Sequence, residues 1–82
     1  MYSLIIGTPI HTDDHKMTIL VRGTGLGLEV HVSPSILVHA STGIETTWYI
    51  YHHQTELGST LFGFSTDTER GIFRQLLRVN GV

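Results

Sequence analysis

Histidine is the most frequent side chain of this sequence that could bind a metal ion or exchange a proton near neutral pH. Six of the 82 residues are histidines: His11, His15, His31, His39, His52 and His53. His11 and His15 share one polar segment, but a zinc site usually needs three or four ligands in fixed geometry. His52 and His53 are adjacent on an expected strand, so they point to opposite faces. The pattern therefore predicts no metal site and favours histidines on the surface.

Motifs for catalysis or nucleotide binding are not visible. The only adjacent carboxylates, Asp13 and Asp14, fall in an expected turn. The glycines at 23, 25 and 27 lack the G-x-G-x-x-G order, and neither a helix nor a Lys-Ser/Thr pair follows them. No G-x-S-x-G sequence is present. We therefore expect a non-enzymatic protein with no catalytic residue and no cofactor, in which any ATPase activity belongs to a partner.

The charge balance argues against strong DNA binding by this chain alone. Five Lys and Arg residues stand against seven Asp and Glu, which gives a net charge of −2 with neutral histidines. DNA-binding surfaces usually carry a basic patch, because phosphate neutralisation supplies much of the affinity. The absence of cysteine suits a cytoplasmic protein. Apolar runs such as Leu4–Ile6 are too short to cross a membrane, and no signal peptide is expected.

Period-two alternation of apolar residues predicts antiparallel strands near 2–11, 17–22, 26–32 and 44–51, and a fifth strand is expected at 60–64. In the first strand, Tyr2, Leu4, Ile6 and Ile10 share the expected core face. In the fourth strand, Trp48 belongs to the core face, while Tyr49 and Tyr51 share the opposite face. A polar turn over 11–15 and a glycine turn over 23–25 join the first three strands.

Two segments predict helices. Ser33 followed by Pro34 is a typical helix start, which predicts a short helix through Val38. Thr66 and Glu69 have capping-box spacing and open a helix over 66–80. Its expected packing face carries Ile72, Phe73, Leu76 and Leu77, and its arginines are Arg70, Arg74 and Arg78. These arginines form either a solvated face, the favoured interpretation, or contacts to DNA phosphates or to another subunit.

Three segments of the chain together resemble the N-terminal domain of the RuvA family. They are Met1–Gly7, Gly23–Val32, and a final run with Leu61-Phe62-Gly63-Phe64, Glu69-Arg70, Phe73, Leu76-Leu77 and Asn80-Gly81-Val82. Pattern alone predicts an all-β barrel or meander. The resemblance implies a five-stranded OB-fold Greek-key barrel over 1–64, with a short helix after strand 3. A C-terminal helix over 65–82 would lead into a helix-hairpin-helix domain that is missing here.

The resemblance also implies a function and partners. RuvA-like proteins are non-catalytic subunits of the Holliday junction branch migration complex, which acts in DNA recombination and repair. The implied partners are Holliday junction DNA, a RuvB-like ATPase held by a further C-terminal domain, and other subunits of a homotetramer. A cytoplasmic location with no membrane contact is expected. We also expect these 82 residues alone to bind junction DNA poorly or not at all.

The RuvA family carries an acidic pin, a pair of neighbouring carboxylates before the last strand of this domain. The matching loop is expected over 53–59, where Glu56 aligns with the first acid and Leu57 replaces the second. Glu56 is therefore either a half-charged pin or an ordinary solvated acid. Tyr49 and Tyr51 form either a base-stacking platform or, the favoured interpretation, a subunit interface. The alternative for the whole chain is a stand-alone OB-fold that binds single-stranded nucleic acid or a protein.

Overall fold

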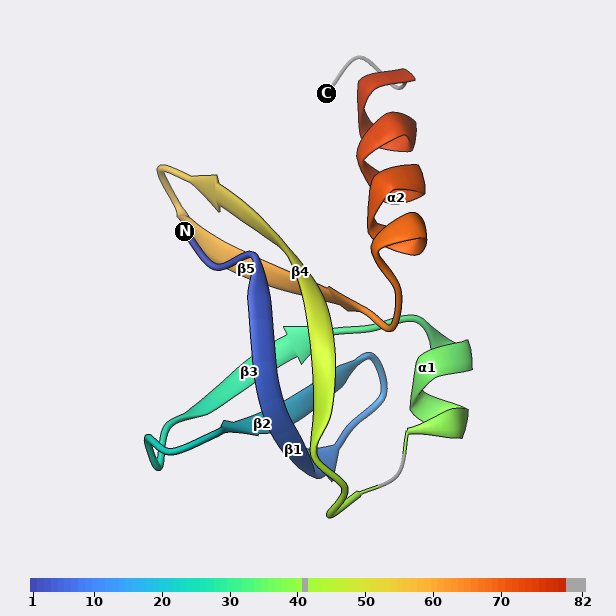
Figure 1. Cartoon of the computed structure of the whole chain (residues 1–82). Helices are drawn as coiled ribbons and strands as arrows, with labels where there is room; N and C mark the ends of the chain where they lie inside the picture. Colours follow the sequence, from blue (N-terminus) through green and yellow to red (C-terminus); the bar gives the residue numbers. More distant parts are fainter. Residues whose placement is uncertain (41, 80–82) are drawn as a thin grey trace.

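Five strands and two helices follow one another in the order expected from the sequence (Figure 1). The computed structural model describes residues 1–40 and 42–79. The elements are β1 (Leu4–Thr12), β2 (Lys16–Val21), β3 (Gly27–His31), α1 (Pro34–His39), β4 (Thr46–Thr55), β5 (Gly58–Phe64) and α2 (Asp67–Val79). The predicted all-β fold with a helix after the third strand and another at the end is confirmed.

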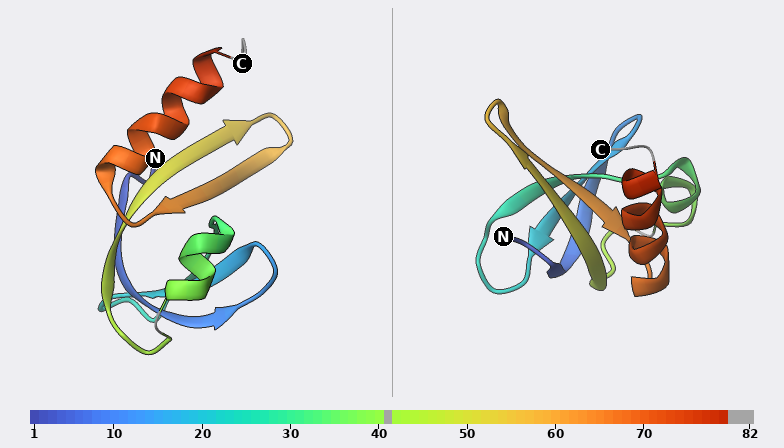
Figure 2. Two further views of the ribbon diagram at one scale, coloured as in Figure 1. Left: turned by 90° about the vertical axis from the view of Figure 1, so that its right-hand side faces the viewer. Right: turned by 90° about the horizontal axis from the view of Figure 1, so that it is seen from above.

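The strands close into a barrel in the order β1-β2-β3-β5-β4. One half of β1 pairs with β2, and its first four residues pair with β4, so this strand closes the barrel. β3 and β5 pair in parallel and meet at His31 and Phe62. This arrangement is the five-stranded OB-fold. Figure 2 shows that the β4–β5 hairpin and α2 both extend beyond the barrel.

The core is one cluster of eight buried side chains, and all of them come from the barrel, its β3–α1 connection and α1. They are Ile5, Met17, Ile19, Val30, Val32, Ile36, Trp48 and Ile50. The expected alternation is confirmed where β2, β3 and β4 cross the core, because the residues beside each of their buried side chains are not buried. Trp48 is buried as expected.

The expected core face of β1 is wrong. Leu4, Ile6 and Ile10 are exposed, whereas Ile5, Gly7 and Pro9 are buried. The physical reason lies at Gly7, where an added Cβ would lie 2.5 Å from Ile19 Cγ2 and 2.5 Å from the Leu20 carbonyl oxygen. Since β1 and β2 approach this closely, only glycine fits at this inward-facing position, and Ile5 and Pro9 share its face.

The loop expected over 53–59 is also wrong. The β4–β5 ladder continues to the pair Thr55 and Gly58, which leaves only Glu56 and Leu57 in the turn. Thr55 Oγ1 accepts a hydrogen bond from the Leu57 amide (3.2 Å) and donates one to the Gly58 carbonyl (3.2 Å). Gly58 has φ +142°, which favours glycine. Backbone pairing thus extends both strands through residues whose polar side chains suggested a loop.

The local signals for turns and caps are confirmed. Gly23 and Gly25 have φ of +74° and +70°. Ser33 caps α1, with its Oγ accepting a hydrogen bond from the Ile36 amide at 3.3 Å. Thr66 Oγ1 accepts from the Glu69 amide at 3.2 Å. The predicted end of the helix at Asn80, and the Asn80–Val82 part of the resemblance, lie outside the described residues.

No helix within 1–40 and 42–79 combines the length and the apolar character that crossing a membrane requires.

Candidate functional site

Arg70 joins α2 to the barrel. Its Nη1 donates to the Ser3 carbonyl (2.7 Å) and to the Ile50 carbonyl (3.3 Å). Its Nε donates to Asp67 Oδ1 at 3.1 Å, and its guanidinium lies 5.5 Å from the centre of the Tyr49 ring. Only 14% of the Arg70 side chain is exposed. A solvated face is therefore the wrong interpretation for Arg70, because the first turn of α2 lies over the end of the β1–β4 ladder.

An aromatic cluster supports the same helix. The Phe73 ring lies 5.5 Å from Tyr51, 5.1 Å from Phe62 and 5.2 Å from Phe64, centre to centre. Aromatic pairs at these distances interact favourably in tilted and edge-on geometries. The expected packing face is only partly covered, since Ile72 and Leu76 are 53% and 55% exposed. None of the α2 side chains is fully buried.

Tyr49 and Tyr51 lie on the outer face of β4 as expected, but α2 passes over them. Tyr49 contacts Arg70 and Tyr51 contacts Phe73, and both side chains are half-buried. Part of each ring is therefore already engaged within the chain. The surface that each tyrosine still offers is limited.

Arg74 and Arg78 lie further along α2 and are exposed. The other three cations are paired: Lys16 Nζ lies 3.5 Å from Glu29, Arg22 Nε lies 3.6 Å from Glu45, and Arg70 binds Asp67. In the part of the chain that the structure describes, no ion pair involves Arg74 or Arg78. Among residues 1–40 and 42–79, the two Lys or Arg side chains without an ion pair therefore both lie on α2, and they are too few to form a broad basic patch.

Glu56 lies at the tip of the β4–β5 hairpin with Leu57, which is 100% exposed. The tip and the far end of α2 both extend from the barrel and lie well apart (Figure 1). The structure therefore separates Glu56 from the arginines. The β4–β5 ladder continues up to the turn, so the Glu56 carboxylate lies at the end of a fully paired hairpin.

Three of the histidines, His31, His52 and His53, make packing or hydrogen-bonding contacts. His52 Nδ1 accepts from the Tyr2 amide at 3.1 Å, and the two rings stack at 5.6 Å. His31 contacts Phe62, and His53 stacks on Tyr51 of the same strand. Across residues 1–40 and 42–79, no three His, Cys, Asp or Glu side chains gather in a way that could hold a metal ion.

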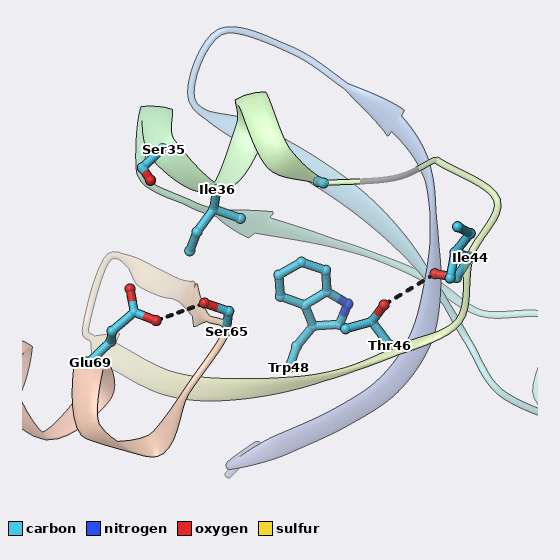
Figure 3. Close-up of a pocket in the computed structure, with 8 residues that line it drawn as sticks. Ser35, Ile36, Ile44, Thr46, Trp48, Ser65 and Glu69 are labelled. Atoms are coloured by element: carbon cyan, nitrogen blue, oxygen red, sulfur yellow. Dashed lines mark hydrogen bonds between the residues drawn. The ribbon is translucent and has the colours of Figure 1, made fainter.

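Two features of the site leave no recognisable pattern in the sequence. The acceptors of Arg70 are main-chain carbonyls of Ser3 and Ile50, and no side-chain pattern marks them. A cavity beside Trp48 forms from segments that are far apart in the sequence (Figure 3). Both features require segments that are distant in the sequence to lie side by side, and only the folded barrel brings them together.

Comparison with known proteins agrees with this architecture. The model of the family described as "RuvA N terminal domain" matches residues 1–63, which is the barrel almost to its last residue. A protein of Dichelobacter nodosus named Holliday junction branch migration complex subunit RuvA is 39% identical over 64 residues. That match covers 78% of this chain and 31% of the relative.

A second relative of the same name, from Halorhodospira halophila, is 43% identical over 67 residues, covering 79% of this chain and 32% of that protein. The chain thus spans about a third of the length of these relatives. Since the family match extends over most of the chain and coincides with the observed barrel, this chain belongs to the RuvA N-terminal domain family.

Proposed function

We propose that this chain is the N-terminal domain of a RuvA subunit of the Holliday junction branch migration complex, acting in DNA recombination and repair. The observation that carries the proposal is the 39–43% identity across the barrel to proteins of that name. In this proposal the domain is non-catalytic, and a RuvB-like ATPase supplies the energy of branch migration. The expected location is the cytoplasm.

The domain would act as a scaffold and would leave most phosphate contacts to another domain. Only Arg74 and Arg78 are free of ion pairs within the described residues, and the net charge is −2. Two cations neutralise too few phosphates for tight binding at physiological salt. We propose that residues 1–64 are the barrel and that the helical segment 65–82 leads into a helix-hairpin-helix domain of a longer protein, with Arg74 and Arg78 near the outlying phosphates.

The outer surface of β1 suits the subunit contacts of a homotetramer. Leu4, Ile6 and Ile10 point outward along one row, and Leu20 lies beside them because it pairs with Thr8. These four residues form the β1 outer patch. Tyr49, which pairs with Leu4, extends it towards α2. Contiguous exposed apolar surface of this kind marks an interaction site, and we propose that copies of the chain meet there.

Glu56 is proposed as the pin. Gathered in a tetramer, four copies of this carboxylate near the crossover would repel DNA phosphates and keep the separating strands apart. Each subunit offers one charge at this turn, because Leu57 takes the neighbouring position. The two-residue turn at the end of a paired hairpin holds that charge in a defined place.

Substitution of Glu56 in the full-length protein tests the pin. We expect Glu56→Gln to leave junction affinity and unfolding free energy unchanged, because the side chain is exposed. Strand opening at the crossover, measured with 2-aminopurine fluorescence, should fall. Asp14→Asn is the control, since Asp14 is an exposed acid in the turn before β2 and, within the described residues, makes no ion pair. Unchanged strand opening in the Glu56 variant would remove the pin role.

A second measurement tests the whole assignment. The full-length protein should prefer four-way junctions to single strands of the same length and salt concentration. Equal affinity for both would contradict the proposal and would favour a stand-alone OB-fold that binds single strands or a protein.

A further inference from the structure

The tip of the β4–β5 hairpin carries an apolar side chain beside the acid. Leu57 is 100% exposed and shares the two-residue turn with Glu56. Turn positions usually hold Gly, Pro, Asn, Asp or Ser, because these residues suit the bent backbone or form hydrogen bonds with it. A leucine at this position gains no burial within the chain. Leu57 therefore presents its whole apolar side chain to whatever the tip meets outside the domain.

The hairpin holds this side chain away from the barrel. The ladder between β1 and β4 ends at Tyr49, and β3 meets β5 at Phe62. The last four pairs of the β4–β5 ladder lie beyond both points and end with Thr55 and Gly58. Four pairs at ~3.3 Å per residue extend the ribbon by about 13 Å. Figure 2 shows this part of the hairpin standing clear of the barrel.

Charge decides which part of DNA this tip can meet. Between Thr46 and Phe64 the hairpin has no Lys or Arg, and Glu56 is its one carboxylate. The tip therefore repels phosphates and has no lysine or arginine to bind them. Nucleobases differ, because their faces carry no charge and apolar side chains such as leucine insert between stacked bases in proteins that bend DNA. An acid beside a leucine thus avoids the DNA backbone and fits the bases.

We infer that Leu57 is a wedge, a side chain that inserts between base pairs at the junction crossover and holds them unstacked. The inference rests on the proposed function, which brings the hairpin tip to the crossover. A base pair at the centre of an open four-way junction has a stacking neighbour on one side only, so less stacking is lost there than within a continuous duplex. Glu56 acts on the phosphates by repulsion, and Leu57 acts on the bases by occupying the space between them.

Unstacking is measured with 2-aminopurine placed beside the crossover of a four-way junction, because its fluorescence rises when it leaves the stack. With saturating full-length protein, we expect Leu57→Asn to reduce this rise by about twofold or more, since asparagine suits a turn and is not apolar. Leu57→Met should keep the rise, because methionine also inserts between bases. Junction affinity should stay the same in both variants, because phosphate contacts elsewhere supply it.

The matched control is Val38→Asn, because Val38 is 78% exposed on α1, away from the hairpin tip (Figure 1). It should leave the fluorescence rise unchanged. Salt separates the two tip residues. The loss caused by Glu56→Gln should shrink between about 50 and about 300 mM salt, because charge repulsion is screened. The loss caused by Leu57→Asn should persist, because insertion of an apolar side chain involves no charge.

Two results would overturn the wedge and leave the proposed function intact. One is a full-length protein that prefers junctions and opens the strands equally well with Leu57→Asn. The other is a lower oligomeric mass of Leu57→Asn without DNA, measured by analytical ultracentrifugation, because the leucines would then pack against one another in the assembly. A full-length protein with no preference for junctions would instead remove the proposed function, and the wedge with it.

Discussion

The barrel and α2 are held in place by different kinds of contact. The barrel with α1 buries eight apolar side chains in one cluster, while α2 contributes none. α2 is attached through the hydrogen bonds of Arg70 and the ring contacts of Phe73. Apolar burial is non-directional and stabilises the barrel as a whole, whereas hydrogen bonds depend on direction. We infer that the barrel sets stability and that Arg70 sets the direction in which α2 leaves it.

The largest difference between the two regions should appear when equal side chains are truncated. Ile19 is fully buried, and Ile72 is 53% exposed on α2. We expect Ile19→Ala to lower the free energy of unfolding by about 2–5 kcal/mol through lost burial and a residual cavity. Ile72→Ala should cost about 0.5 kcal/mol or less. Urea denaturation followed by circular dichroism measures both, and equal losses would contradict the contrast.

A pair of glycines sharpens the comparison. An alanine Cβ at Gly7 would lie 2.5 Å from the Leu20 carbonyl oxygen, and one at Gly71 would meet no atom within 4 Å. We expect Gly7→Ala to destabilise the chain by about 1–3 kcal/mol through overpacking. Gly71→Ala should stabilise it by up to about 1 kcal/mol, because alanine favours the helix. Thermal unfolding should move in opposite directions, and a Gly7→Ala variant as stable as the original chain would show that the close β1–β2 approach is absent.

The attachment of α2 to the barrel can be tested by replacing Arg70. Replacing it with glutamine removes the charged hydrogen bonds to the Ser3 and Ile50 carbonyls, and we expect a loss of about 1–3 kcal/mol. Hydrogen exchange should accelerate in α2 more than in β2. Arg74→Gln is the matched control, since Arg74 is exposed on the same helix and should change stability by about 0.5 kcal/mol or less. Equal effects of the two substitutions would remove the special role of Arg70.

The smallest effect concerns the start of α2 and depends on pH. The pKa of Glu69 is lowered from its ordinary value of 4.5, chiefly by the Ser65 hydrogen bond; burial opposes this shift, and two hydrogen bonds with Thr66 add to it. A carboxyl group with a lowered pKa stabilises the fold above its unfolded value, and this contribution is lost as pH falls through the folded value. Denaturation midpoints below pH 4.5 should therefore decline less in Glu69→Gln than in the original chain. Identical declines would show that Glu69 does not contribute.

Much of the fold was predictable because its signals are local. The caps at Ser33 and Thr66 and the glycine turn at 23–25 depend on neighbouring residues only, so sequence reasoning located them. The core faces of β2, β3 and β4 were also predictable, because only one face of each strand is consistently apolar. β1 has apolar residues on both faces, with Ile5 opposite Leu4 and Ile6, so alternation could not decide which face would point inward.

The candidate site was less predictable. Arg70, Arg74 and Arg78 recur every fourth residue and look equivalent in the sequence, yet only Arg70 lies over the end of the β1–β4 ladder. The side chains of Trp48 and Glu69 likewise come together only in the folded protein, where both line one cavity. Glu56 was placed near a turn, but the two-residue tip followed from the pairing of Thr55 with Gly58.

By itself, the sequence determined the number and order of the elements, the helix starts and the small number of cations, because these depend on residue type and short-range spacing. The tertiary structure decided which face of β1 is buried, which arginine joins α2 to the barrel, and where the cavity beside Trp48 lies. Those features depend on contacts between residues as distant as Ser3 and Arg70. Closure of the barrel brings such residues together, and no local pattern encodes that meeting.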